Sequence, residues 1–171
     1  DYVFDGKKTE PYVEDDPAHP LSEYGHSKLA GEAAVLADSP DHVSVRVSWV
    51  FGPDKPSFVD MMLQRALQGV PLEAVGDKTS SPSFTGDLAA WLLPFLAGDL
   101  PGGLYHACNA GACSWSEYGQ EAVDIAVSLG WPLKTTTVTP VPLASMTAFR
   151  AARPVHTVMD CTKLSNAISK S

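Results

Sequence analysis

The chain has 171 residues, of which 44% are hydrophobic and 19% charged, and its formal net charge is −8. This composition suits one folded domain with a sizeable core and differs from that of a disordered segment. No basic patch suited to nucleic acid is visible, and no apolar run reaches the ~18 residues of a membrane span. The three cysteines form no CxxC pair, so we expect reduced thiols in the cytoplasm rather than a disulfide framework or a zinc site.

The first residues are apolar. Tyr2, Val3 and Phe4 precede the turn signal Asp5-Gly6, and the chain does not begin with methionine. This pattern is typical of the last residues of a strand. We therefore expect the strand to begin in a preceding segment and the chain to be part of a longer protein.

Three elements are predicted in the next part of the chain. Ser22 can cap a helix over residues 23–38, which is rich in good helix formers. The β-branched, alternating run 43–49 predicts a strand. The apolar residues of 57–68 recur with the helical period and are followed by Gly69, so we expect a second helix there.

The second half continues the alternation of strands and helices. Short strands are predicted at 71–75 and 104–107, and residues 135–141 are expected to be extended. Helices are predicted at three further places, after a cap at Thr85, after a capping box at 114–117 and after a cap at Thr162. Such alternation indicates an α/β fold, although no GxGxxG phosphate loop occurs.

Tyr24 and Lys28 lie four residues apart on the first predicted helix, so their side chains share one face. The positive charge favours the phenolate form of the tyrosine. Such a tyrosine can protonate a carbonyl oxygen as hydride arrives at the carbon, and the lysine can hydrogen-bond a cofactor ribose. The spacing alone is also compatible with a surface tyrosine near a solvated lysine.

Longer blocks surround this pair and occur in order along nearly the whole chain. They are DYVFDG (1–6), PYVEDD (11–16), PLSEYGHSKLAGE (20–32), RVSWVFG (46–52), PSFTGDLA (82–89), GLYH (103–106), SW (114–115) and RP (153–154), followed by Asp160. Together they resemble the extended short-chain dehydrogenase/reductases, and among them the dTDP-4-dehydrorhamnose reductases. A run of ordered blocks is far more specific than the tyrosine–lysine spacing alone.

The resemblance implies roles for the matched residues. Tyr24 would be the catalytic acid and Lys28 its partner, and both would contact the cofactor together with Val50 and Phe51. The remaining roles would be substrate binding, by Asp1, Tyr2 and Trp49 at the deoxysugar and nucleotide and by Arg153 at the diphosphate. The third catalytic hydroxyl of the family, a Thr or Ser, precedes the position matched by Asp1 and would lie outside this chain.

Three of the substrate-binding assignments have a structural alternative. Trp49 could be an aromatic residue of the core or its rim, and Tyr2 could be part of a strand core. Arg153 could form a surface ion pair instead of binding phosphate oxygens. His106 lies in an apolar strand and is expected to be a hydrogen-bonded core histidine rather than a ligand. The five histidines show no HxxxH or HxH spacing, so no metal is expected.

The implied fold is the C-terminal part of an extended short-chain dehydrogenase/reductase, with an incomplete Rossmann sheet and a small substrate-binding lobe. Residues 1–52 would be a remnant of the Rossmann domain and residues 84–107 would return to it. Residues 53–83 and 108–171 would form the lobe.

The implied reaction is reduction of the C4 ketone of a dTDP-4-dehydro-6-deoxysugar by NADPH or NADH, in dTDP-L-rhamnose biosynthesis. This chain alone would be inactive, because it contains neither the glycine loop nor the third hydroxyl. The partner would be the dTDP-sugar, and a homodimer is compatible with the family. Two alternatives are a non-catalytic regulatory subunit, like that of methionine adenosyltransferase, and a sugar-nucleotide epimerase.

Overall fold

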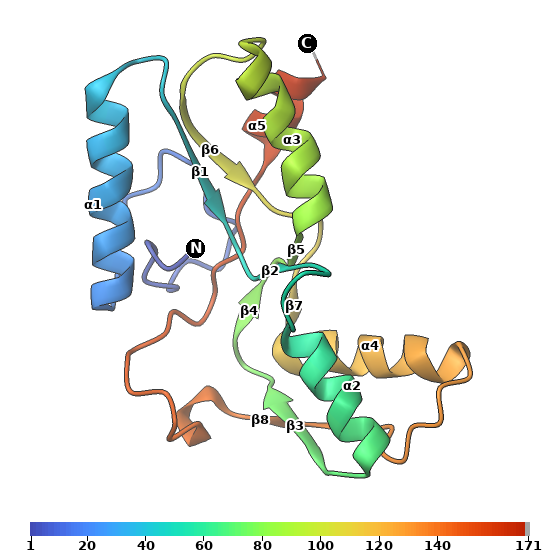
Figure 1. Cartoon of the computed structure of the whole chain (residues 1–171). Helices are drawn as coiled ribbons and strands as arrows, with labels where there is room; N and C mark the ends of the chain where they lie inside the picture. The colour runs from blue at the N-terminus through green and yellow to red at the C-terminus, as the bar shows by residue number, and fades with distance from the viewer. Residues whose placement is uncertain (170–171) are drawn as a thin grey trace. The chain divides into compact units, whose positions relative to one another are not determined.

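The structure is a computed structural model that describes residues 1–169 (Figure 1). Helices alternate with strands, and the longer strands pair in parallel, which confirms the predicted α/β class. The chain divides into two units. Unit 1 comprises residues 1–50, residues 80–112 and the described chain from Arg150 onward, and unit 2 comprises residues 51–79 and 113–149.

Unit 1 is built around two parallel strands. Its elements are α1 (Glu23–Asp38), β1 (Val43–Val47), α3 (Thr85–Ala97), β6 (Gly103–Ala107) and α5 (Thr162–Ile168). The register of the strand pair runs from Val43 opposite Gly103 to Val47 opposite Ala107.

The two faces of this strand pair have different neighbours. Tyr105 and Ala107 pack with Leu164 of α5 and with apolar side chains of α3. Figure 1 shows α1 on the other side of β1, where Arg46 points to Glu32 of α1. The pair is therefore covered by helices on both sides, as in other parallel sheets.

Unit 2 packs two helices against a second parallel strand pair. Its elements are α2 (Phe58–Gln68), β3 (Leu72–Val75), α4 (Trp115–Ser128), β8 (Val138–Val141) and the short 3-10 helix η1 (Leu143–Ser145). The core is apolar and buried, and consists of Met62, Ala66, Leu72, Ala74, Val123 and Val138. The predicted capping box of α4 is confirmed, since Ser114 N donates to Glu117 at 2.7 Å and Glu117 N donates to Ser114 Oγ at 3.2 Å.

Four strands of two residues each lie at or near the sequence boundaries of the two units. They are β2 (Val50–Phe51), β4 (Thr79–Ser80), β5 (Ser83–Phe84) and β7 (Cys113–Ser114).

Several element boundaries differ from the prediction. Residues 2–4 form a turn, closed by a bond from Phe4 N to Asp1 O at 3.2 Å, rather than the predicted strand end. The strand predicted to reach residue 49 stops at Val47, because Trp49 takes a left-handed backbone conformation. Thr85 and Thr162 are the first helical residues instead of the caps.

The expected lobe of residues 108–171 also divides differently. The described chain from Arg150 onward groups with unit 1, because Tyr12 N donates to Val158 O and Asp160 N donates to Tyr12 O, both at 2.8 Å. The last two residues of that lobe lie outside the described residues. We predicted that one part of the chain binds the nucleotide cofactor and that the other is a substrate-binding lobe. This assignment of functions to the two units stays a prediction.

Within residues 1–169, no helix has both the length and the apolar character that a membrane crossing requires.

Candidate functional site

The start of α1 is held close to the first residues of the chain. Ser22 Oγ accepts a bond from Gly25 N at 3.2 Å and thereby caps the helix. Gly25 is the one buried residue of α1, and a Cβ there would overlap the carbonyl oxygen of Tyr2 and the side chain of Pro20. This close approach, which only glycine permits, sets the first turn of α1 beside Tyr2.

An ion pair fastens the middle of α1 to β1. Arg46 donates to Glu32 twice, from Nε at 2.7 Å and from Nη2 at 2.6 Å. The side chains are 7% and 11% exposed, so this bidentate pair is largely shielded from solvent. Glu32 lies one helical turn after Lys28, and the pair therefore fixes the face of α1 that carries the predicted catalytic residues.

A buried histidine continues this network into β6. His106 Nε2 lies 3.4 Å from Arg46 Nη1, and its Nδ1 lies 3.2 Å from Tyr12 O. Because arginine has no acceptor and a carbonyl has no donor, Nδ1 carries the proton and Nε2 accepts. Burial lowers the pKa of His106, Glu14 opposes this shift and Arg46 adds to it. The expectation of a hydrogen-bonded core histidine agrees with these contacts.

Tyr24 and Lys28 lie together on the solvent-facing side of α1. Lys28 Nζ is 5.4 Å from the centroid of the Tyr24 ring, and Tyr24 is 57% exposed. The Tyr2 ring meets the Tyr24 ring edge-to-face, with centroids 5.6 Å apart and planes at 88°. The pair is thus accessible to a ligand and is flanked by an aromatic residue from the start of the chain.

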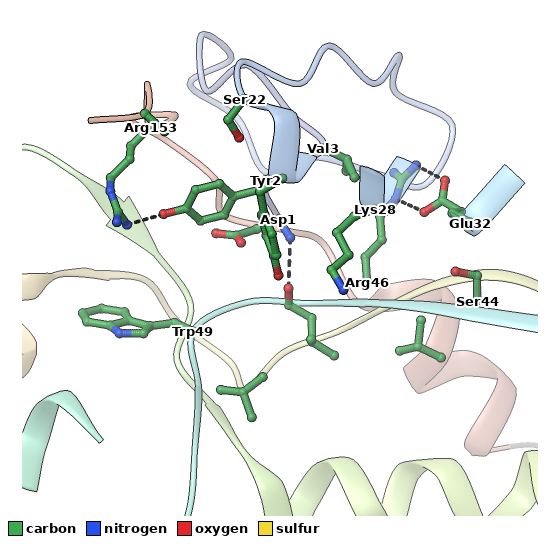
Figure 2. A pocket seen from close by; sticks show the side chains of 15 residues that line it. Asp1, Tyr2, Val3, Ser22, Lys28, Glu32, Ser44, Arg46, Trp49 and Arg153 are labelled. Atoms are coloured by element: carbon green, nitrogen blue, oxygen red, sulfur yellow. Dashed lines mark hydrogen bonds and ion pairs between the residues drawn. The ribbon is translucent and has the colours of Figure 1, made fainter. Parts of the chain in front are cut away.

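Arg153 approaches Tyr2 from the C-terminal part of unit 1. Its Nη1 donates to the Tyr2 hydroxyl at 2.5 Å, and its Cζ lies 5.9 Å from the centroid of that ring (Figure 2). Asp1 Oδ2 accepts from Thr157 Oγ1 at 2.7 Å and from Ser48 Oγ at 3.0 Å. The bonds of Arg153 to Tyr2 and of Thr157 to Asp1 join segments that are more than 150 residues apart in the sequence.

Trp49 has an unusual backbone. Its φ of 43° makes it the one non-glycine residue in the described chain with a positive φ. The left-handed region is sterically unfavourable for a bulky residue, and such backbone strain is common at functional sites. Its carbonyl oxygen accepts from Ser83 N at 3.2 Å, which helps to hold the conformation. Figure 2 shows the indole ring at the same opening as Tyr2 and Arg153.

A cavity of about 750 Å³ brings most of the predicted site residues together, within the usual size range of a ligand pocket. The predicted residues that line it are Asp1, Tyr2, Tyr24, Lys28, Trp49, Val50 and Arg153. Phe51 is not among its lining residues, belongs to unit 2 and packs against Tyr118 at a centroid distance of 5.8 Å. The cofactor role predicted for Phe51 therefore receives no support from this cavity.

Sequence reasoning missed Glu32 and Arg46, which also line the cavity. A signal was present for each of them. Arg46 is the one charged residue in a strand rich in valine, and Glu32 continues the face of Lys28 by one turn.

No cluster of three or more potential metal-ligating side chains occurs among residues 1–169.

Comparison with known proteins identifies the family. Residues 1–171 match the model of the RmlD substrate binding domain over the whole chain. The chain belongs to the RmlD substrate-binding domain family. Among curated relatives, a dTDP-4-dehydrorhamnose reductase from Burkholderia thailandensis is 33% identical over 169 residues, covering 93% of this chain and 56% of the relative. The spore coat polysaccharide biosynthesis protein SpsK from Bacillus subtilis is 42% identical over 118 residues, covering 69% of this chain and 41% of the relative.

A solved structure of the family agrees with this assignment. The crystal structure of dTDP-4-dehydrorhamnose reductase from Bacillus anthracis, in complex with NADP, superposes with a TM-score of 0.86 at 30% identity. The match covers 96% of this chain and 56% of that chain. The resemblance to the dTDP-4-dehydrorhamnose reductases is thereby confirmed. The chain spans about half the length of the curated relatives that it matches.

Proposed function

We propose that the whole protein reduces the C4 ketone of a dTDP-4-dehydro-6-deoxysugar with NADPH or NADH, in the formation of dTDP-L-rhamnose. The observation that carries this proposal is the pairing of Tyr24 with Lys28 on the wall of the cavity, in a chain of the RmlD family. Relatives and a solved structure named dTDP-4-dehydrorhamnose reductase support the substrate class. The 171 residues alone are expected to be inactive, since they contain no glycine-rich phosphate loop.

Tyr24 is the proposed proton donor. Tyr24 lines the cavity from an exposed helix turn, so that a ketone bound there can accept a hydrogen bond from its hydroxyl. The phenolate left after proton transfer is negative, and the ammonium of Lys28 stabilises it because opposite charges attract at this distance. Bound NADPH or NADH supplies the hydride.

The cavity also has groups that suit a reduced nicotinamide cofactor. Lys28 carries three N–H donors that fit ribose hydroxyls, and Val50 offers an exposed apolar side chain on the wall of the same cavity. We propose that these residues orient the cofactor, while pyrophosphate binding depends on other parts of the whole protein.

The other end of the cavity fits the sugar nucleotide. The Arg153 guanidinium is always charged and presents a planar fork suited to phosphate oxygens. The edge-to-face contact of Tyr2 with Tyr24 sets one aromatic wall, and the Trp49 indole offers a second apolar surface. Asp1 supplies a carboxylate acceptor for sugar hydroxyls, held in place by Ser48 and Thr157.

Replacement of Tyr24 tests the proposal. Tyr24→Phe in the whole protein removes the hydroxyl and keeps the ring, so we expect kcat to fall by about 10²–10⁴-fold, the usual contribution of general acid catalysis. Oxidation of NADPH or NADH with a dTDP-4-dehydro-6-deoxysugar is the readout. Tyr105→Phe is the matched control, because its hydroxyl bonds to Pro101 O and does not line the cavity. Wild-type turnover by Tyr24→Phe would refute the proposed mechanism.

The two alternatives predict different readouts. An epimerase returns the hydride to its substrate and consumes no net NADPH or NADH. A regulatory subunit binds a partner protein in fixed stoichiometry and shows no turnover. The retention of Tyr24, Lys28, Trp49 and Arg153 around one cavity favours the reductase. The cytoplasmic location and the homodimer stay predictions.

A further inference from the structure

Two cysteines that have no part in the proposed reaction lie against each other in unit 1. Cys108 directly follows β6, and Cys161 directly precedes α5, 53 positions further along the chain. The backbone N–H of Cys108 donates to Cys161 Sγ at 3.2 Å. Both thiols are free, and Cys161 Sγ also lies 3.9 Å from Met159 O. This is a paired dithiol, unlike the third cysteine, Cys113.

The contact makes the two sulfurs chemically unequal. The neighbouring Cys108 thiol lowers the pKa of Cys161, against burial, and the hydrogen bond from the Cys108 backbone N–H contributes in the same direction. The same pairing and burial raise the pKa of Cys108. Since the thiolate is the reactive form, Cys161 is the sulfur prepared to attack, and Cys108 is the one prepared to resolve.

Cys161 is also the more accessible sulfur. Cys108 is buried, whereas Cys161 is partly exposed. Both line a cavity of about 240 Å³ whose walls come from Trp91 of α3 and from Leu164 and Ile168 of α5. A small reagent therefore has a route to the pair that does not require unfolding of β6.

We propose that Cys108 and Cys161 form a redox-active pair that a small-molecule disulfide, such as glutathione disulfide, converts to an intramolecular disulfide. The Cys161 thiolate attacks one sulfur of glutathione disulfide, which breaks its S–S bond and expels one glutathione thiolate. Cys108 then loses its proton to solvent and attacks the mixed disulfide at Cys161, which expels the second glutathione. The two protein thiols are oxidised, and one glutathione disulfide is reduced to two glutathiones.

The disulfide would tie the start of α5 to the end of β6. In the reduced chain this junction depends on the Cys108–Cys161 contact and on the packing of Leu164 against Tyr105 and Ala107. A covalent link restricts local opening of α5, so its amide protons should exchange more slowly after oxidation. This property does not depend on the reductase activity.

Oxidation of the whole protein tests the pair. We expect treatment with glutathione disulfide, followed by alkylation and non-reducing peptide mapping, to yield a linked peptide that contains Cys108 and Cys161. Cys113 should remain alkylatable and serves as the internal control. Dithiothreitol should restore both thiols, and hydrogen exchange in α5 should slow at least several-fold in the oxidised form.

Single variants separate the two roles. Cys108→Ala should stop the reaction at a stable mixed disulfide of glutathione with Cys161. Cys161→Ala should leave Cys108 unmodified, because its sulfur is buried and burial by itself disfavours the thiolate. The absence of the linked peptide from the folded wild-type protein would overturn the proposal, whichever variants fold. A link that involves Cys113 would overturn it as well.

Discussion

Helix α1 of unit 1 and the helices α2 and α4 of unit 2 are fixed in different ways. The helices α2 and α4 bury the apolar side chains of Met62, Ala66 and Val123 in a common core. Helix α1 buries only Gly25 among its 16 residues and exposes Tyr24 and Lys28. A serine cap and the Glu32–Arg46 ion pair hold it, together with the packing of the half-buried Leu29 against the apolar cluster around Phe4.

This difference is suited to the work of each helix. A bidentate ion pair fixes direction as well as distance, so it can set the rotation of a helix whose outer face must meet a ligand. An apolar core tolerates exchanges that conserve volume and specifies orientation less sharply. The helix that presents the proposed catalytic pair is therefore the one with the directional anchor.

The largest expected effect comes from breaking this anchor. Arg46→Leu leaves the Glu32 carboxylate shielded and unpaired, which costs about 3–5 kcal/mol of unfolding free energy for a buried pair. Urea denaturation of the whole protein measures this loss. We also expect turnover to fall, because the ion pair that fixes the orientation of α1 relative to β1 is lost.

The double variant Glu32→Leu/Arg46→Leu is the control. Replacing both charges with apolar groups removes the unpaired carboxylate, so most of the stability should return. Turnover should recover less than stability does if the pair positions α1. A single variant as stable as the wild type would show that solvent reaches Glu32 freely.

A core substitution in unit 2 provides the contrasting case. Met62→Ala leaves a cavity beside Ala66 and Val123 and should cost about 2–4 kcal/mol of unfolding free energy, as for other large-to-small core changes. Hydrogen exchange should accelerate in α2 and α4, while α1 keeps its wild-type rates. Equal acceleration in α1 would contradict an independent anchor for that helix.

The sequence predicted the helices and their caps better than the long-range polar contacts that hold the segments together. The span of α1, the Gly69 end of α2 and the Ser114 capping box follow from local patterns of propensity and capping, and each is confirmed. The Glu32–Arg46 pair and the Asp1–Thr157 bond join residues 14 and 156 positions apart. Local patterns carry no information on such pairings, which depend on the packing of distant segments.

The same limit applies at the site. The spacing of Tyr24 and Lys28 was sufficient to place them on one helix face, and the family resemblance supplied Asp1, Trp49 and Arg153. Neither source predicted the left-handed backbone of Trp49, because a positive φ in a bulky residue is imposed by its surroundings and not by its own preference. The strand predicted over residues 43–49 is therefore two residues longer than the observed strand, which ends at Val47.

A smaller effect is expected from pH through His106. Burial lowers the pKa of its imidazole below the ordinary 6.5, with Arg46 adding to this shift and Glu14 opposing it. The unfolded chain therefore takes up the proton first, and stability present above pH 6.5 should be lost as the pH falls toward the folded-state pKa. The slope should not exceed about 1.4 kcal/mol per pH unit for one proton.

Denaturant unfolding between pH 7 and pH 5 measures this slope, and His106→Asn removes the titrating group. The carboxylates of Asp16 and Asp160 have lowered pKa values and titrate in a more acidic range. A slope that persists in His106→Asn would assign the effect to another group.

The smallest expected effects come from removing the serine caps at the starts of α1 and α4. Ser22→Ala and Ser114→Ala each remove a side-chain cap, and each should cost about 1 kcal/mol of unfolding free energy. Ser114 shares its box with Glu117, and α4 is also held by the buried Val123, so we expect Ser114→Ala to leave turnover unchanged. Ser22 caps the turn that carries Tyr24, and its loss should lower kcat several-fold although it costs no more stability than Ser114→Ala. Equal turnover in both variants would mean that Gly25 and the ion pair alone position that turn.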